Sequence, residues 1–250
     1  MRADSCSWGR GPGALILRLR SALQGGAGSP SLSSDWGDGG LFAPNTGAAS
    51  AEPDPDEAEI EEAIAQVRAF SEELYDLCLL SWMSSEGLEG LLLDAAREAG
   101  RSGPAILFDY SKERIRLLWR GCARVEREIH RLAGLARFDL RHDGIYSAPL
   151  EPDHSILPAL APHFLGRFGG LSFALVDCRR RLCILSLPEG LRFLEGDDAL
   201  RLLPDAESSD AERLWRRYFA ATENPQRRNP GLQRRFMPER YWKYLVELRI

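Results

Sequence analysis

Apolar positions recur at two different spacings along this chain, and the change in spacing separates helical from extended segments. Between residues 56 and 100 they recur every three or four positions, and Gly87 is expected to interrupt this run. The same spacing is clearest over residues 111–133, where a second stripe holds five arginines. Helices are therefore predicted over both ranges. The apolar stripe of the second range consists of Ile115, Leu118, Cys122, Val125, Ile129 and Leu132.

After Gly134 apolar and polar positions alternate, which is typical of strands. Residues 136–148 predict one β-hairpin around the tight-turn pair Asp143-Gly144. Residues 173–185 predict a second hairpin, whose turn carries three arginines.

Further helices are predicted around these hairpins. A helix over residues 155–168 is expected to kink or break at Pro162. A capping-box match over residues 209–212 predicts the start of another helix, which carries Leu214, Trp215, Tyr218 and Phe219. A terminal helix is expected to begin near Pro238, and residues 14–23 fit either a short helix or a strand.

These elements predict an α+β fold, in which helices pack around a small antiparallel sheet made from two β-hairpins. Gly, Ser, Ala and Pro dominate residues 24–51, a composition typical of flexible linkers. We therefore expect a disordered N-terminal segment over residues 1–52 and a single α+β domain over residues 53–250.

Charge is distributed unevenly, although the formal net charge of the 250-residue chain is only −5. Residues 51–100 hold 2 Lys or Arg against 14 Asp or Glu, whereas residues 211–250 hold 10 against 4. This balance argues against a protein that coats polyanions, but it allows one focused basic surface. The alternative is that the basic residues form a solvated face that pairs with the acidic helices.

Other classes of protein find little support in the sequence. Five cysteines without a CxxC pair indicate reduced thiols rather than a disulfide framework. No apolar run is long enough to cross a membrane, so a cytoplasmic protein without a membrane partner is expected. Nucleotide-binding glycine loops and the Gly-x-Ser-x-Gly elbow are absent from the sequence. The sequence therefore assigns no cofactor.

The C-terminal residues 223–250 combine seven Arg or Lys with four aromatic residues. Cationic side chains bind phosphates and aromatic rings stack on bases, so this composition predicts a nucleic-acid interface. The alternative is that the rings dock the final helix on the core while the arginines stay outside. The predicted interface consists of Arg137, Arg227, Arg228, Arg234, Arg235, Arg240, Tyr241, Trp242 and Lys243.

A second group of residues could carry chemistry. Glu151, Asp153 and His154 lie in one expected turn, and His163 follows nine positions later. Carboxylates and imidazoles can act as acid and base or ligate a divalent metal, so Asp153, His154 and His163 are the candidate catalytic residues. The spacing does not match a HExxH helix and no Cys pair joins the cluster, so we assign no metal. Alternatively, Asp153 caps the following helix and both histidines form local hydrogen bonds.

Short motifs occur at residues 134–138, 150–154, 160–164, 214–219 and 228–245. Together they resemble a bacterial family linked to DNA repair, whose domain has no known function. The resemblance covers residues 110–250 well and residues 55–110 loosely. It implies DNA metabolism as the context and, as partner, a radical SAM protein with a helix-hairpin-helix module, which is usually encoded beside the family. Other members are fused behind a uracil-DNA-glycosylase-like domain, which residues 1–50 do not resemble, so no base-recognising activity is implied.

Three hypotheses follow for the function. The first is a cytoplasmic DNA-repair accessory that binds DNA and presents it to the radical SAM partner. The second is an enzyme that acts on nucleic acid through Glu151, Asp153, His154 and His163. The third is a protein-interaction module whose acidic helices and basic C-terminal segment dock a partner. The sequence leaves open whether the chain is catalytic.

Overall fold

The computed structural model describes residues 12–24, 56–204, 210–227 and 229–248. These residues form two compact units, one of helices and one built around a β-sheet. The predicted α+β class is confirmed. Of the flexible N-terminal segment expected over residues 1–52, only residues 12–24 are among the described residues. Helix α5 (Glu113–Leu135) contributes residues 113–119 to the helical unit and the remainder to the sheet unit.

The helical unit contains α1 (Pro12–Leu23), α2 (Glu57–Phe70), α3 (Glu72–Met83), α4 (Glu89–Ser102) and the 3-10 helix η1 (Pro104–Phe108). Ser71 has extended backbone and ends α2, and its Oγ accepts the amide hydrogen of Leu74 at 3.2 Å. One serine thus separates two helices where the sequence showed a single helical run. Gly87 adopts a φ of 66° ahead of α4, so the interruption expected there is confirmed.

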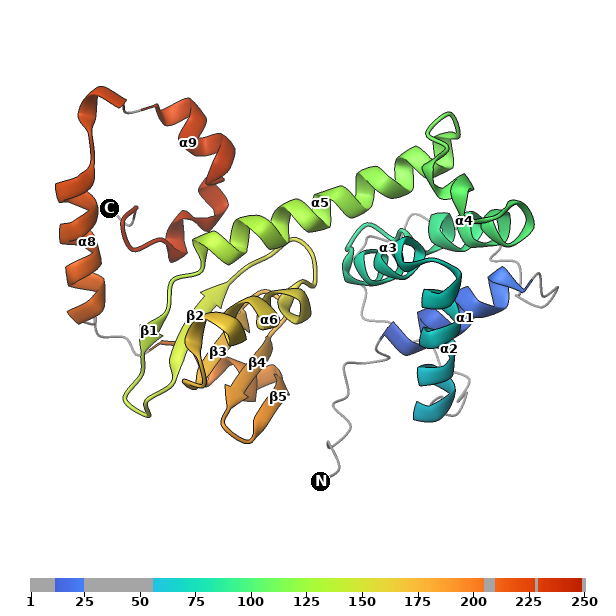
Figure 1. Cartoon of the computed structure of the whole chain (residues 1–250). Helices are drawn as coiled ribbons and strands as arrows, with labels where there is room; N and C mark the ends of the chain where they lie inside the picture. The colour runs from blue at the N-terminus through green and yellow to red at the C-terminus, as the bar shows by residue number, and fades with distance from the viewer. Residues whose placement is uncertain (1–11, 25–55, 205–209, 228, 249–250) are drawn as a thin grey trace, which may run out of the picture. The chain divides into compact units, whose positions relative to one another are not determined.

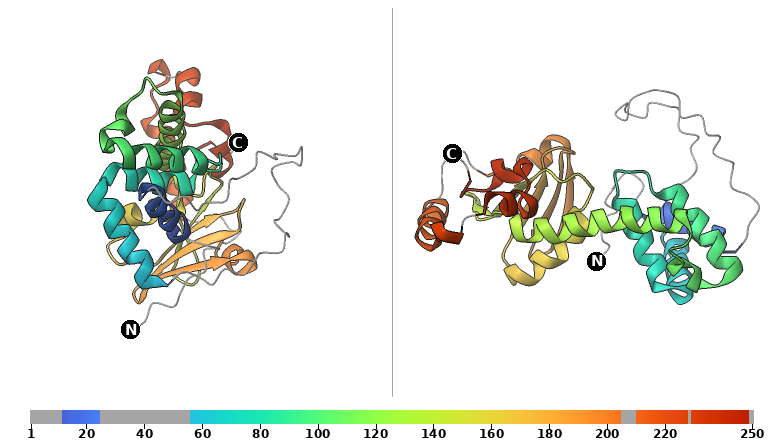
Figure 2. Two further views of the ribbon diagram at one scale, coloured as in Figure 1. Left: turned by 90° about the vertical axis from the view of Figure 1, so that its right-hand side faces the viewer. Right: turned by 90° about the horizontal axis from the view of Figure 1, so that it is seen from above.

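Helix α1 packs against α2 and α4 (Figures 1 and 2), and it buries Leu15, Ile16, Leu19 and Ala22. A Cβ atom at Gly100 of α4 would collide with the carbonyl of Leu23 at the end of α1. Residues 12–23 are therefore a helix within the core of this unit. The sequence left residues 14–23 open between a short helix and a strand, and it included them in the flexible N-terminal segment expected over residues 1–52.

Helix α5 confirms the prediction for residues 111–133, with one difference in its buried stripe. Ile115, Leu118 and Cys122 are buried as expected. One turn beyond Val125, however, the buried side chain is Glu128, which is 2% exposed, while Ile129 is only partly buried. A carboxylate therefore occupies a core position of this helix.

The sheet has five strands in sequential order, β1 (Asp139–Leu140), β2 (Tyr146–Leu150), β3 (Phe173–Asp177), β4 (Leu182–Leu187) and β5 (Gly190–Glu195). Both predicted hairpins are present, as β1–β2 and β3–β4. A parallel pairing of β2 with β3 joins them into one sheet, and β5 adds an antiparallel edge strand. The sequence pattern anticipated neither of these two additions.

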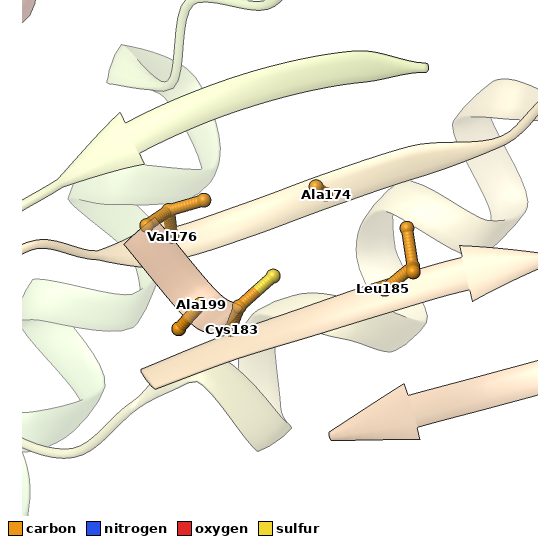
Figure 3. Close-up of a cluster of buried hydrophobic side chains, with 5 residues drawn as sticks. All are labelled: Ala174, Val176, Cys183, Leu185 and Ala199. Carbon is orange, nitrogen blue, oxygen red and sulfur yellow. The ribbon is translucent and has the colours of Figure 1, made fainter. Parts of the chain in front are cut away.

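Helices cover both faces of the central strands, which explains why every residue of β3 is buried. Helix α6 (Leu157–Phe168) covers one face, where the rings of Phe164 and Phe173 lie 6.4 Å apart. Figure 3 shows the cluster on the other face, where Ala199 of α7 (Gly196–Leu200) joins Val176 and Cys183. Helix α6 contains Pro162 and continues past it to Phe168.

The C-terminal part contains α8 (Asp210–Thr222), the 3-10 helix η2 (Pro225–Arg227), α9 (Pro230–Phe236) and the 3-10 helix η3 (Glu239–Tyr244). Asn229 caps α9 by accepting the amide hydrogen of Leu232 at 3.0 Å. The terminal helix expected from Pro238 is the 3-10 helix η3. Among the described helices, none combines the length and the apolar character that a membrane span requires.

Candidate functional site

The loop of residues 151–154 lies at the carboxyl end of β2, beside the carboxyl end of its parallel neighbour β3. Asp177, the last residue of β3, is fully buried and accepts a hydrogen bond from Nη1 of Arg180 at 2.9 Å. The same guanidinium donates to the carbonyls of Pro152, at 2.9 Å, and Asp153. The parallel pairing thus brings two turns together, and one arginine fixes the backbone of the candidate loop.

Glu128 of α5 binds the same loop through its backbone amides. Its Oε1 accepts the amide hydrogen of Asp153 at 2.8 Å, and its Oε2 accepts that of His154 at 2.8 Å. The hydroxyl of Tyr241 donates to Oε1 at 2.5 Å. A buried carboxylate is tolerated only with such partners, because an unpaired buried charge is strongly unfavourable. Glu128 therefore acts as the structural centre of this region.

Tyr241 completes this arrangement from η3. Its ring is 2% exposed, and burial together with the hydrogen bond to Glu128 raises the pKa of Tyr241 to about 12. The hydroxyl therefore remains a donor throughout the physiological pH range. A ring held in this way is an anchor for η3 and is not available to stack on a base.

The candidate catalytic residues do not converge. His154 is buried, and its Nδ1 accepts the amide hydrogen of Ser85 at 3.2 Å. His163 is exposed on α6 with its ring against the edge of Phe164, at 4.9 Å between centroids. Asp153 forms an ion pair with Arg240, at 2.6 Å between Oδ2 and Nη2. Each group thus has its own separate surroundings.

Across the described ranges, no group of three or more His, Cys, Asp or Glu side chains is placed to hold a metal ion. Glu151, the fourth member of the predicted cluster, accepts hydrogen bonds from Nζ of Lys243 and from the Tyr244 hydroxyl, both at 2.6 Å. Burial raises the pKa of Glu151, but these two bonds outweigh that effect and leave it below its usual value.

Four of the cations predicted to bind nucleic acid pair with carboxylates of the chain itself. Arg240 pairs with Asp153 and Lys243 with Glu151, which fastens η3 to the 151–154 loop. The Arg137 guanidinium pairs with Glu247 at 2.5 Å, and Arg234 pairs with Glu239 at 2.8 Å. Trp242 is partly buried and donates its indole N–H to the Met237 carbonyl at 2.7 Å. These residues stabilise the C-terminal part of the fold.

The remaining predicted cations are in a different situation. Arg227 and Arg235 are exposed, and neither side chain has a partner within the described residues. Arg217 on α8, which the sequence did not single out, is also exposed without such a partner. Arg228 lies outside the described residues. Positive charge available to an external polyanion is thus found on α8, η2 and α9.

Exposed aromatic rings occur on the same helices. The Trp215 ring lies under the Arg137 guanidinium, at 5.3 Å, and its indole N–H donates to Oε2 of Glu247 at 2.9 Å. The Tyr218 ring follows at 5.6 Å from Trp215, with 35° between the planes. We call Arg137, Trp215 and Tyr218 the aromatic stack. Tyr218 is 58% exposed and Phe236 of α9 is 63% exposed, so both rings face solvent.

The sequence contained a signal for this surface, but it was ambiguous. Leu214, Trp215 and Tyr218 follow helical spacing, which fits either a buried stripe or a binding face. Exposure decides between these interpretations, because Leu214 is 69% exposed and Trp215 is 38% exposed. An exposed group of large apolar residues is typical of a binding surface.

Comparison with known proteins agrees with the extent of the resemblance seen in the sequence. No curated protein and no solved structure matches the chain at a significant level. A family model, described as a domain of unknown function (DUF4130), matches residues 86–247. This range includes Glu128, the 151–154 loop, the sheet and the four C-terminal helical segments. Since the match covers well over half of its length, the chain belongs to the DUF4130 family of domains of unknown function.

Proposed function

We propose that this chain binds DNA through the exposed arginines and aromatic rings of α8, η2 and α9, and serves as a cytoplasmic accessory in DNA repair. The supporting observation is the coincidence of exposed rings, in Tyr218 and Phe236, with exposed cations that no described carboxylate neutralises. Charge supplies affinity for phosphates, and rings stack on bases irrespective of sequence. The proposed contacts are Arg217, Arg227, Arg235, Trp215, Tyr218 and Phe236.

The paired residues have a supporting role in this proposal. Arg240, Tyr241, Trp242 and Lys243 hold η3 against the 151–154 loop instead of contacting the ligand. Arg137 orients the Trp215 ring through the cation–π contact, and Glu247 holds the same ring by accepting its indole N–H. A ring fixed beforehand loses less conformational entropy when a base stacks against it.

The partner is the second element of the proposal. A surface that binds DNA without converging acid, base or metal groups suits a protein that presents DNA to an enzyme. We therefore propose that a radical SAM protein with a helix-hairpin-helix module is that enzyme. Co-purification that persists after nuclease treatment is the expected result, and an interaction abolished by nuclease would argue for joint binding to DNA alone.

Fluorescence anisotropy of labelled single-stranded and duplex DNA tests the interface. Replacing Arg217, Arg227 and Arg235 together with Gln removes three cations, which lowers the slope of log affinity against log salt by about 2 for single-stranded DNA and about 2.7 for duplex DNA. Between 50 and 200 mM salt, these slopes correspond to differences in affinity of roughly 20-fold and roughly 40-fold. An unchanged slope would refute the proposed contacts.

A matched control replaces three other exposed arginines with Gln. Arg101 of α4, Arg127 of α5 and Arg192 of β5 have no side-chain partner within the described residues, so their loss changes net charge equally. Equal loss of binding in the two triple variants would show that only overall charge matters.

The alternative proposal is an enzyme that acts on nucleic acid through the cluster of Glu151, Asp153, His154 and His163, as metal ligands or as acid and base. It has less support, because Asp153 is ion-paired, His154 is buried and His163 lies on exposed α6. Incubation of DNA with the full chain and Mg²⁺ or Mn²⁺, followed by denaturing electrophoresis, tests this alternative. Cleavage that disappears in the His154→Asn variant would support it.

A further inference from the structure

An aromatic pocket opens in the sheet unit, away from the 151–154 loop. It has a volume of about 330 Å³ and is lined by Ala136, Phe138, Tyr146, Phe164, Arg167 and Phe168. Ligand pockets in proteins span roughly 300–1,000 Å³, so this one suits a single flat ring system. We call it the aromatic pocket.

Four rings form most of the pocket, and their geometry follows from the fold. Phe164 and Phe168 lie one turn apart on α6, and Phe138 packs edge-on against them at 4.9 and 4.7 Å. The Tyr146 ring, from the first residue of β2, lies 5.4 Å from that of Phe168. Phe164 is 1% exposed and forms the floor, whereas the other three rings are only partly buried.

A collapsed apolar core would not leave these rings open. The neighbouring Phe173 is completely buried beneath them, so the core continues under the pocket floor. Phe138, Tyr146 and Phe168 instead keep part of their surface accessible around an open volume. Aromatic faces and edges arranged in this way bind planar rings by stacking and edge-to-face contacts.

The charge of the lining indicates which planar ring would bind. Arg167 is exposed in the pocket wall, and its guanidinium has no partner within the described residues. No carboxylate lines the pocket. His163 precedes Arg167 by one turn on α6 and is also exposed. The preferred ligand therefore joins a flat aromatic ring to an anionic group, which is the chemistry of a nucleotide.

We propose that the aromatic pocket binds one unstacked nucleobase, and that Arg167 binds the phosphate of the same nucleotide. Ala136 lines the pocket, and the next residue, Arg137, belongs to the aromatic stack through its contact with the Trp215 ring. One short segment thus contributes to both features. A base turned out of a bound strand could thus enter the pocket. That source of the base rests on the proposed DNA interface, whereas nucleotide binding by the pocket does not.

Titration with deoxynucleoside monophosphates, followed by calorimetry and by NMR of the aromatic protons, tests the pocket directly. Shifts of the Phe138, Tyr146 and Phe168 resonances in the wild-type protein are the expected result. Inorganic phosphate should bind at least about five-fold more weakly, because stacking of one base contributes roughly 5- to 150-fold in affinity. Phosphate binding as strong as nucleotide binding, or the absence of ring shifts at millimolar nucleotide, would overturn the proposal.

Variants separate the ring contacts from the charge contact. Phe168→Leu should weaken nucleotides and nucleosides alike by about ten-fold. Arg167→Gln should weaken only the phosphorylated ligands, and Arg192→Gln on β5 should change neither. Circular dichroism confirms that each variant is folded, and the wild-type resonance shifts decide the result should Phe168→Leu fail to fold. Equal weakening of nucleoside and nucleotide by Arg167→Gln would contradict the assigned phosphate contact.

An oligonucleotide carrying one 2-aminopurine distinguishes a base in a strand from a free nucleotide. Stacking in the pocket should change its fluorescence, and Phe168→Leu should reduce that change without abolishing strand binding. Strand binding with no ring shifts from any ligand would overturn the pocket and leave the proposed function intact. Nucleotide binding without strand binding would support the pocket as a nucleotide site and refute the DNA interface.

Discussion

Replacement of Glu128 by Ala is the most severe single change that we expect in the sheet unit. The 2% exposed carboxylate accepts the amide hydrogens of Asp153 and His154 and the hydroxyl hydrogen of Tyr241. Each buried donor left without an acceptor costs about 1–3 kcal/mol, which sums to roughly 3–9 kcal/mol for three. Water entering the space reduces this cost, and breaking a buried charged group from its partners typically costs about 3–5 kcal/mol. We therefore expect a loss of about 4 kcal/mol.

Urea unfolding of the full chain, followed by far-ultraviolet circular dichroism, measures this loss. In thermal unfolding, about 4 kcal/mol corresponds to a decrease of roughly 8–16 °C in the melting temperature for a chain of this size. Glu126→Ala is the matched control, because Glu126 is exposed on the same helix and has no side-chain partner within the described residues. It should change the free energy of unfolding by less than about 0.5 kcal/mol.

The Tyr241→Phe variant refines this test, because it removes one of the three donors and leaves the carboxylate in place. A hydrogen bond to a charged acceptor contributes about 1.5–3 kcal/mol, so its loss should be smaller than that of Glu128→Ala. The double variant should lose less than the sum of the two single variants, since both remove the same hydrogen bond. A loss below about 1 kcal/mol for Glu128→Ala would refute the role assigned to this carboxylate.

Three further predictions concern other parts of the structure. The pKa of Tyr241 is raised from 10.0 to about 12, so the folded state keeps a proton that the unfolded state loses. The contribution of this shift to the free energy of unfolding is complete below pH 10 and declines as the pH rises towards 12. Tyr241→Phe should therefore make the decrease of the urea midpoint at alkaline pH shallower. An unchanged pH profile would count against the raised pKa of Tyr241. Gly100→Ala should destabilise the helical unit by about 1–3 kcal/mol, because the added Cβ collides with the Leu23 carbonyl. Gly90→Ala on the same helix is the control, because its Cβ meets no atom within 4 Å, and it should stabilise the unit by about 0.5–1 kcal/mol. If both variants shifted the melting temperature in the same direction, the packing of α1 against α4 would be contradicted. Lys243→Gln should lower the free energy of unfolding by less than about 1 kcal/mol, because the ion pair is partly solvated, with 55% of the Lys243 and 32% of the Glu151 side chain exposed. A larger loss in urea unfolding would show that η3 depends on this pair.

Local patterns in the sequence were sufficient for α5, α6, α8 and both hairpins, but not for α7, α9 or the division between α2 and α3. The spacing of Ile115, Leu118 and Cys122 predicted α5, and Asp143-Gly144 predicted the turn between β1 and β2. Both signals depend on residues that are close in the chain. The parallel pairing of β2 with β3 spans the whole of α6, and no local signal specifies it. That pairing nevertheless determines where the 151–154 loop lies.

The role of the basic residues depends on contacts that sequence composition cannot reveal. Glu151 meets Lys243 across 92 positions, and Glu128 meets Tyr241 across 113. The sequence left open that acidic residues 51–100 neutralise the basic segment. In the structure Arg240 pairs with Asp153 and Glu128, and Lys243 pairs with Glu151. Asp153 and Glu151 belong to the candidate catalytic loop. One of the sequence alternatives, that aromatic rings anchor the C-terminal helix, agrees with the burial of Tyr241.

The position of Glu128 illustrates a further limit. Ile129 and Glu128 are neighbours, and apolar periodicity selects the isoleucine for the buried stripe. The structure buries the glutamate, because the amides of Asp153 and His154 and the hydroxyl of Tyr241 supply its partners. A buried carboxylate can be recognised only when the donors that surround it are known.

The indole N–H resonances in a ¹H–¹⁵N correlation spectrum test the central claim most directly, when single-stranded DNA is added to the full chain. Trp215 lies in the aromatic stack next to exposed Tyr218, whereas Trp119 of α5 donates its indole N–H to the Leu107 carbonyl within the helical unit. We predict that the Trp215 resonance shifts progressively with DNA at low salt, returns as salt is raised, and moves far more than that of Trp119. A Trp215 resonance that stays unchanged at saturating DNA would contradict DNA binding through α8.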